Sequence, residues 1–332
     1  MKDLIQKFTQ AVGPSGYEDG VRAVVREEIE PYADKIREDG LGNLIARKGT
    51  LREGGKRIML AGHMDELGVM VTHVDDNGFE RFTTLGYVFR QMIIGGRVRF
   101  LNGTAGVIAA EPQPSNERAP GWDKYYIDVG ASSREACPVQ TGDVGCFDRP
   151  FQELGTRLVS KAMDDRIAVA VMAAALKEIK DTPNELYFVF TVQEEEGLRG
   201  AKVAAFGVDP EIGLAIDVTD TGDTPKCDVM DVKLGGGPAV KVKDSYLVTN
   251  PKLVRWMERA AQKLDMPYQR EILTGGGTDA GAINETRAGA PSICLSIPTR
   301  YIHSPSEMVD YNDVVNAVRL LVELVSSPVV LE

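Results

Sequence analysis

Short apolar strands alternate with helical patterns at both ends of this sequence, and this alternation is the feature that most restricts the fold. Strands joined by helices that return the chain to the next strand build a layered α/β sheet. The run LYFVF (186–190) is apolar at every position, which indicates a strand covered on both faces. We therefore predict an α/β fold with a mixed central sheet flanked by helices on both faces. The predicted strands are 42–47, 56–63, 186–192, 213–220 and 291–298, and the predicted helices are 1–12, 19–30, 166–180, 198–207, 250–265 and 311–325.

The alternation stops after about residue 67, where short strands are joined by turn sequences instead of helices. DDNG (75–78) and NG (102–103) are typical of tight hairpin turns, and a proline-rich loop follows at 111–121. This stretch predicts a small all-β barrel inserted into the larger α/β domain. The predicted domains are residues 1–69 plus 158–332 for the α/β domain and 70–157 for the inserted barrel.

Composition narrows the classes of partner. The 332 residues carry a net charge of −11 with a pI near 5.0, and no basic run with interleaved aromatic residues occurs. These features argue against a protein that binds nucleic acid. No apolar run reaches about 18 residues, so we expect no membrane span. The four cysteines are scattered without a CxxC pair, which predicts reduced thiols and a cytoplasmic protein.

Side chains that can bind metal ions gather at the ends of the predicted strands. His63 ends one strand, His303 follows another, and Asp217 lies near the end of a third. Three adjacent glutamates, residues 194–196, follow the apolar run LYFVF, and Asp164–Asp165 precede a long apolar helix. Ligands in open α/β sheets collect at the carboxyl ends of the strands. Imidazole and carboxylate groups suit zinc, cobalt or manganese, and this many ligands is what a two-metal hydrolytic site needs.

Each of these features also has an ordinary structural explanation. Histidines at strand ends are often structural, paired aspartates cap helices, and glutamate runs commonly face solvent. We favour a metal site because those explanations would have to hold at five places at once, and they leave carboxylates uncompensated after the most apolar strand. Two other classes remain open on the residues alone: a glycosidase that uses paired glutamates, and a metal-binding protein without catalysis.

The motifs and their order resemble those of the tetrahedral (TET) dinuclear metalloaminopeptidases, which are related to glutamyl and deblocking aminopeptidases. The wider clan also contains carboxypeptidases and amidohydrolases, but an insertion between His63 and Asp164 is typical of the aminopeptidase branch. The matching segments are GPSGYE (13–18), AGHMDE (61–66), IDVGASSREA (127–136), KAMDDR (161–166), TVQEEEGLRG (191–200), AIDVTD (215–220), GGTDAGAI (276–283) and YIHSPSE (301–307).

This resemblance implies a metal-dependent aminopeptidase that releases N-terminal amino acids from short peptides. It implies two divalent metal ions per subunit, which would be Zn, Co or Mn. The implied ligands are His63 and Asp217 for the first ion, Glu195 and His303 for the second, and Asp164 as the bridge between them.

The resemblance also implies roles for neighbours of the ligands. Glu194 would be the general base, and Asp65 would orient the imidazole of His63 from two residues along the chain. A cis peptide bond is implied between Asp164 and Asp165. Glu196 stands where relatives commonly have an apolar residue, and the alternation of side chains predicts that it turns away from the site.

Two further features have expected roles. The glycine-rich segment GGGTDAGAI (275–283) lacks the GK[ST] ending of a phosphate-binding loop and does not follow a clear predicted strand. The resemblance instead implies a wall of the substrate pocket, with Thr278 and Asp279 near the side chain of the N-terminal residue. His73 lies in the predicted barrel without nearby carboxylate motifs, so we expect a structural role.

Relatives of this kind assemble as dimers and as hollow tetrahedral dodecamers that admit short unfolded peptides. The resemblance therefore implies a homo-oligomer, with the inserted barrel as the expected dimer contact.

Overall fold

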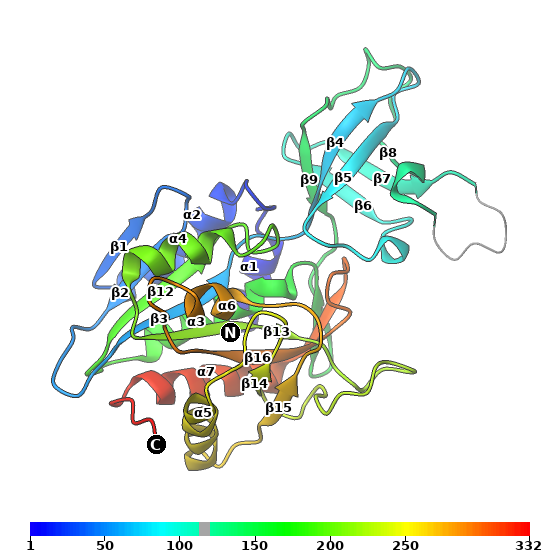
Figure 1. Ribbon diagram of the computed structural model, residues 1–332. Helices are drawn as coiled ribbons and strands as arrows, with labels where there is room; N and C mark the ends of the chain where they lie inside the picture. The colour runs from blue at the N-terminus through cyan, green and yellow to red at the C-terminus, as the bar shows by residue number, and fades with distance from the viewer. Residues whose placement is uncertain (113–119) are drawn as a thin grey trace.

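Figure 1 shows the computed structural model of the protein, which describes residues 1–112 and 120–332. Both chain ends lie in a large α/β part, and a smaller β part projects from one side of it. Residues 113–119 of the predicted proline-rich loop lie outside the described residues. The helices are α1 (Lys2–Gln10), α2 (Asp19–Ile29), α3 (Met163–Glu178), α4 (Arg199–Val208), α5 (Pro251–Lys263), α6 (Asp279–Asn284) and α7 (Tyr311–Val325), with the short 3-10 helices η1 (Glu30–Tyr32), η2 (Arg90–Met92) and η3 (Trp122–Lys124).

The large part is built on a mixed sheet in the order β1-β2-β12-β3-β13-β16-β17-β11-β10, with β14 and β15 attached beside β16. Its centre is parallel: β12 pairs with β3, β3 with β13, and β13 with β16. The strands of this sheet are β1 (Lys35–Glu38), β2 (Leu44–Lys48), β3 (Arg57–His63), β10 (Gln152–Leu154), β11 (Arg157–Ser160), β12 (Glu185–Thr191), β13 (Ile212–Thr219), β14 (Ala239–Lys243), β15 (Gln269–Ile272), β16 (Ser292–Arg300) and β17 (Glu307–Asp310).

Strand β3 shows how the sheet separates two layers of helices. Because side chains alternate along a strand, Ile58 and Leu60 join the core beneath α3 and α7, whereas Met59 and Ala61 join a second core beneath α4 and α6. Figure 1 shows α4 and α7 on opposite sides of the sheet. The predicted α/β architecture with helices on both faces is therefore confirmed.

Three details differ from the sequence pattern. The helix predicted at 166–180 begins earlier, at Met163, although its backbone is not helical at Asp164 and Asp165. These two residues are joined by a cis peptide bond, as the family resemblance implies. Several short strands were not predicted, because runs such as KIRE in β1 and QREI in β15 are largely charged. Strand β15 directly precedes the glycine-rich loop, so the expectation that no strand leads into this loop is wrong.

The projecting part is a closed six-stranded barrel in the order β4-β5-β8-β7-β6-β9. Its interior is apolar and includes Val69, Val98, Ile108 and Ile127, which form a core of their own. His73 is exposed on this barrel, where its Nε2 lies 3.4 Å from an Nη2 of Arg134. The barrel strands are β4 (Gly68–Val74), β5 (Glu80–Leu85), β6 (Arg97–Phe100), β7 (Ala105–Ala110), β8 (Tyr125–Asp128) and β9 (Val144–Phe147).

Turn chemistry explains the barrel hairpins. The Oδ1 of Asp75 accepts hydrogen bonds from the backbone N–H groups of Asn77 (2.9 Å) and Phe79 (3.0 Å), and the Oδ1 of Asn102 accepts one from Thr104 (2.9 Å). After β9 the chain returns to the large sheet, since β10 pairs with β11 there. The barrel therefore lies between two strands, β3 and β10, that both belong to the large sheet.

The remaining predictions about the chain as a whole concern thiols and membranes. All four cysteines are free, and two of them, Cys146 and Cys294, are buried. Among the helices in the described part of the chain, none is long and apolar enough to cross a membrane.

Candidate active site

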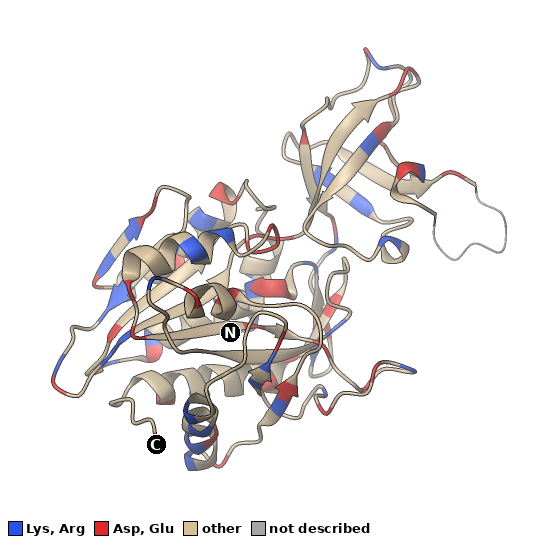
Figure 2. Ribbon diagram, in the orientation of Figure 1, with Lys and Arg blue, Asp and Glu red and all other residues tan. Residues whose placement is uncertain are grey.

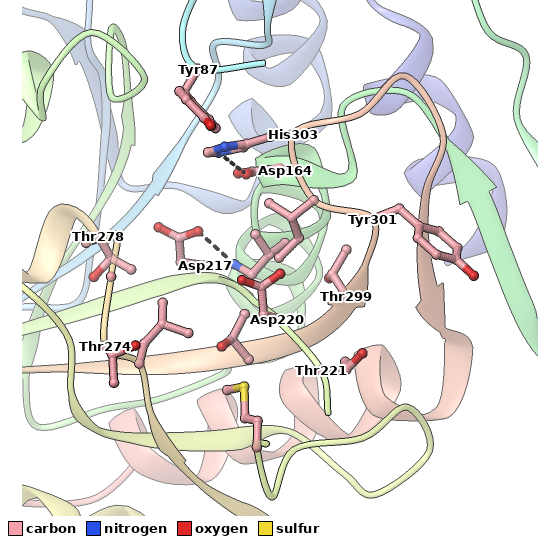
Figure 3. Close-up of a pocket in the computed structure, with 18 of the residues that line it drawn as sticks. Tyr87, Asp164, Asp217, Asp220, Thr221, Thr274, Thr278, Thr299, Tyr301 and His303 are labelled. Atoms are coloured by element: carbon pink, nitrogen blue, oxygen red, sulfur yellow. Dashed lines mark hydrogen bonds and ion pairs between the residues drawn. The ribbon is translucent and has the colours of Figure 1, made fainter. Parts of the chain in front are cut away.

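The parallel sheet brings the predicted ligands together. His63 is the last residue of β3 and pairs in register with Thr191, the last residue of β12, so the glutamates after β12 emerge beside it. Asp217 lies near the end of β13, and His303 follows β16, the next parallel strand. Asp164 reaches the same edge from the first turn of α3. Figure 3 shows Asp164, Asp217 and His303 around one cavity.

Asp164 lies at the centre of this arrangement. Its Oδ1 is 3.0 Å from the Nε2 of His63, and its Oδ2 is 3.4 Å from the Nε2 of His303. Each carboxylate oxygen therefore faces a different histidine. Glu195 completes this side, because its Oε2 is 3.7 Å from the Nε2 of His303. The imidazole and carboxylate groups of three separate segments thus meet around Asp164.

The donor set fits divalent metal ions. Two groups of three residues could each hold a metal ion, because the possible ligand atoms within each group lie within 4.8 Å of one another. The first group is His63, Asp164 and Glu195, and the second is His63, Asp165 and Asp217. The Oε1 of Glu195 is buried without a hydrogen-bond partner in the described part of the chain. Burial, and then the charge of Asp164, raise the pKa of Glu195 well above its ordinary value. Bound cations would compensate these crowded carboxylates.

Asp165 was not assigned from the sequence, although its neighbour was. Its side chain is fully buried, and its Oδ2 accepts a hydrogen bond from the backbone N–H of His63 (3.3 Å). Burial, and then the charge of Asp217, raise its pKa well above the ordinary value. Asp165 therefore supports the end of β3 and also belongs to the second group of possible ligands.

Glu194 is positioned beside the ligands and lines the cavity. Its Oε2 is 3.9 Å from the Nε2 of His63, and only 12% of its side chain is exposed. Burial raises the pKa of Glu194 well above its ordinary value. A buried carboxylate with a perturbed pKa in a cavity is a candidate for a functional role.

Asp65 connects the two sides of the site. Its Oδ1 lies 3.3 Å from the Nδ1 of His63 and accepts a hydrogen bond from the backbone N–H of Glu194 (3.0 Å). Its Oδ2 accepts hydrogen bonds from the N–H of Glu195 (3.2 Å) and the hydroxyl of Ser15 (2.6 Å). Strand β3 ends at His63, so Asp65 reaches the imidazole from the irregular segment after the strand and not from within the strand.

A buried guanidinium, that of Arg166, fixes the segment after β3 that carries Asp65. Arg166, which is completely buried, donates hydrogen bonds to the carbonyl oxygens of Met64, Phe8 (2.8 Å), Ala11 (2.8 Å) and Gly13 (3.1 Å). The start of α3 thereby ties the exit of β3 to the end of α1. Only a planar side chain with five N–H donors can satisfy this many carbonyls at once.

The third glutamate has a different environment. Glu196 is not among the residues that line the cavity, in agreement with the predicted outward orientation. Its Oε1 accepts a hydrogen bond from the backbone N–H of Gly86 (2.9 Å), and its Oε2 is 3.8 Å from an Nη2 of Arg199. Glu196 therefore links α4 to the segment that follows barrel strand β5.

Comparison with known proteins is consistent with this geometry. Residues 42–320 match the family model of the M42 glutamyl aminopeptidases. The chain belongs to this family. A protein of Acetivibrio thermocellus that carries a provisional aminopeptidase name is 50% identical over 98% of each chain. The protein is therefore a peptidase, a hydrolase of the aminopeptidase type, and the resemblance inferred from its motifs is confirmed.

Solved structures share the fold of this M42 chain. The TET1 peptidase of Pyrococcus horikoshii, described as assembling into a tetrahedron or a large octahedral shell, is similar with a TM-score of 0.86, 34% identity and 98% coverage of each chain. A protein of Thermotoga maritima described as an endoglucanase is similar with a TM-score of 0.81, 30% identity and coverage of 97% of this chain and 96% of that one.

Glu307 is a residue of the M42 site that the sequence reasoning did not assign. Its carboxylate is 1% exposed and accepts hydrogen bonds from the backbone N–H groups of Asp164 (2.9 Å) and His303 (2.9 Å). Burial, and then the charge of Asp164, raise the pKa of Glu307 well above its ordinary value. The motif YIHSPSE contains this glutamate and one of its partners, His303, but the other partner, Asp164, lies on a distant segment and cannot be identified from the motif alone.

The site opens into a cavity of about 880 Å³. Thr278 lines the cavity and also caps α6, where its hydroxyl accepts a hydrogen bond from the N–H of Ala280. Asp279 does not line it: its side chain is buried, and its Oδ2 accepts a 2.5 Å hydrogen bond from the hydroxyl of Thr191. Burial raises the pKa of Asp279 to about 6. Of the two predicted pocket residues, only Thr278 faces the cavity.

The barrel side also contributes to the cavity wall. Tyr87 and Phe89, which follow β5, line the cavity beside His303. The ring of Tyr87 is centred 5.8 Å from the imidazole, and the N–H of Phe89 lies 3.4 Å from the carbonyl oxygen of His303. Sequence reasoning missed both aromatic residues, and the only available signal was their position next to a glycine in an otherwise apolar segment.

Proposed function

We propose that this enzyme removes N-terminal residues from short peptides with two divalent metal ions bound by His63, Asp217, Glu195 and His303, and bridged by Asp164. The observation that carries the proposal is the position of Asp164, whose two oxygens each face a different histidine. Zinc, cobalt and manganese all suit this set of imidazole and carboxylate donors.

Two such ions, when bound, polarise the scissile carbonyl and lower the pKa of the attacking water. Glu194 takes a proton from that water and passes it to the leaving amine, because its carboxylate lies beside the ligands and faces the cavity. Asp65 holds the imidazole of His63 and the backbone of Glu194 in fixed relative positions.

Metal dependence and the role of Glu194 can be tested together. Removal of metal by a chelator should abolish hydrolysis of aminoacyl p-nitroanilides, and cobalt, zinc or manganese should restore it. Glu194→Gln should retain both metal ions, measured by elemental analysis, while kcat falls by a factor of about 100 or more. Glu195→Gln is the matched control, because it should lose metal. The reverse pattern in the two variants, or activity that resists the chelator, would contradict the assignment.

Glycoside hydrolysis is a second candidate, because one similar structure is described as an endoglucanase. The geometry favours peptide hydrolysis: Glu194 and Glu195 lie with two histidines around Asp164, and a glycosidase has no need of imidazole ligands. Release of reducing sugar from a β-glucan without cleavage of aminoacyl amides would favour the glycosidase. Release of C-terminal residues from a peptide whose N-terminus is blocked would favour a carboxypeptidase or amidohydrolase of the wider clan.

We also infer that the enzyme self-associates, with the inserted barrel of residues 70–157 as the dimer contact and a tetrahedral dodecamer as the expected form. The shell described for the TET1 peptidase supports this inference. The four free thiols support a cytoplasmic location, where they would remain reduced.

A further inference from the structure

The cations that line the cavity outside the metal site already have anionic partners. Lys241 is fully buried and forms an ion pair with Glu271. Arg300 forms a two-pronged pair with Asp223, with its Nε 2.9 Å from Oδ1 and its Nη2 2.7 Å from Oδ2. Neither positive charge is therefore available to a substrate carboxylate.

The carboxylate of Asp220 has no such partner. It follows β13 directly, and Figure 3 shows it inside the cavity between Asp217 and Thr221. In the described part of the chain, no hydrogen bond or ion pair to a protein group satisfies its side chain. Burial by the surrounding walls raises the pKa of Asp220, although the carboxylate is open to the cavity. An unpaired negative charge in this position attracts a cation from the substrate.

Part of the cavity wall is apolar: Val218, Met230, Ile272 and Leu273 line the cavity together with Asp220. A side chain with a long aliphatic stem and a positive end would contact these walls along its length and place its charge on the carboxylate. Lysine and arginine have this form, whereas glutamate would bring a second negative charge.

We propose that Asp220 is a specificity-determining residue that selects peptides with lysine or arginine at the N-terminus by pairing with the side-chain cation. This inference rests on the proposed aminopeptidase function. Asp228 also lines the cavity and, like Asp220, is solvent-exposed, so water screens both charges and Asp228 adds to the attraction for a substrate cation.

A comparison of lysine with norleucine tests this inference. Norleucine has the same number of side-chain carbons but no ammonium group. With the metal-loaded enzyme, kcat/KM for the lysyl p-nitroanilide should exceed that for the norleucyl compound by about tenfold or more, and the glutamyl compound should be the poorest. Asp220→Asn should lower kcat/KM for the lysyl compound by about tenfold or more and change the norleucyl value less than about threefold.

The control is Asp231→Asn, which makes the same chemical change at an exposed aspartate that does not line the cavity. It should leave both values unchanged, and bound metal should be equal in all three proteins. Equal losses on lysine and norleucine in Asp220→Asn would show that Asp220 binds the α-ammonium group and would overturn the inference. A wild-type enzyme that cleaves norleucine as well as lysine would also overturn it. If the wild-type enzyme cleaved no aminoacyl amide, the aminopeptidase function itself would be wrong.

Discussion

At the scale of single residues, two buried carboxylates that are not themselves predicted ligands hold the predicted metal ligands in position. Asp65 contacts the imidazole of His63 and accepts hydrogen bonds from the backbone of Glu194 and Glu195. Glu307 accepts hydrogen bonds from the backbone N–H groups of Asp164 and His303. Each of these two carboxylates therefore fixes the distance between segments that are far apart in the sequence. Errors of an ångström in such distances are costly for metal binding and for catalysis.

The role of Glu307 leads to a prediction. Glu307→Gln keeps the shape of the side chain but replaces one acceptor oxygen with an NH₂ group, which cannot accept the hydrogen bond from a backbone N–H. We expect metal affinity to fall by a factor of about 10 to 100, measured by competition with a chromophoric chelator. The expected cost to the free energy of unfolding is about 1–3 kcal/mol, measured in urea on the metal-free protein.

A control separates a positioning role from a general loss of stability. Glu258→Gln removes the charge of another carboxylate that is only 7% exposed and that pairs with Arg270 outside the site. It should lower the free energy of unfolding without changing metal affinity. Unchanged metal affinity in Glu307→Gln would show that this residue does not position the ligands.

At the scale of elements, the segment after β5 joins the barrel to the active site. Tyr87 lies against the imidazole of His303 and lines the cavity, and 62% of its surface is exposed. Tyr87→Ala should therefore raise KM by about three- to tenfold through lost contact with the substrate, with little effect on the free energy of unfolding. Steady-state kinetics on a dipeptide amide would measure this. Tyr126→Ala, at a barrel tyrosine that does not line the cavity, should leave KM unchanged; an equal rise would refute the contact.

The first turn of α7 gives a prediction about pH. Asp313 is 1% exposed, and its two oxygens accept hydrogen bonds from the N–H groups of Gly235 (2.7 Å) and Gly237 (2.8 Å). Burial, which outweighs these bonds, raises the pKa of Asp313 to about 6. The ordinary value for an unfolded aspartate is about 4, so the folded state holds the proton more tightly.

It follows that the contribution of Asp313 to stability is largest below about pH 4 and is lost as pH rises to about 6. The difference in the free energy of unfolding between the wild-type protein and Asp313→Asn should fall by about 2–3 kcal/mol across this interval and be constant above it. Urea unfolding of both proteins at several pH values would measure the difference. The other titrating groups are the same in both proteins, so their effects on the free energy of unfolding cancel. A difference that does not vary with pH would contradict the raised pKa.

At the scale of the whole molecule, the architecture separates two parts, whereas charge does not. Figure 2 shows acidic and basic residues on both the α/β part and the barrel. The barrel has a core of its own, and only the segments at its base reach the catalytic cavity. Because the barrel has its own core, its outer surface can contact another subunit without disturbing the predicted metal ligands.

Assembly leads to a prediction about substrate size. If the subunits form a hollow shell, light scattering should give a multiple of the monomer mass, and a short peptide should be cleaved much faster than a folded protein with the same N-terminal sequence. Dissociation by mild denaturant or by substitutions on the barrel surface should reduce this difference in rate. A monomer that cleaves its substrates with the same selectivity by length would contradict a shell.

Much of the fold follows from local sequence. The apolar runs of β3 and β12, the turn residues Asp75 and Asn102, and the cap at Asn250, whose side chain accepts a hydrogen bond from Lys252, depend on neighbours a few positions away. The positions of His63 and Asp217 near strand ends could be predicted for the same reason. The roles expected for these ligands came from the resemblance to a family, because spacing alone left several classes open.

Contacts between distant segments were decided only by the tertiary structure. The sheet order β12-β3-β13-β16 brings residues from separate parts of the chain to one edge. That packing turns Asp279 toward Thr191 and away from the cavity and places Glu307 between the segments of Asp164 and His303. Among the residues that the structure describes, it leaves Asp220 without a partner. The sequence by itself determined the elements and the chemical types available at their ends. Which of those groups face one another, and which stay unpaired, depends on long-range packing that no local pattern encodes.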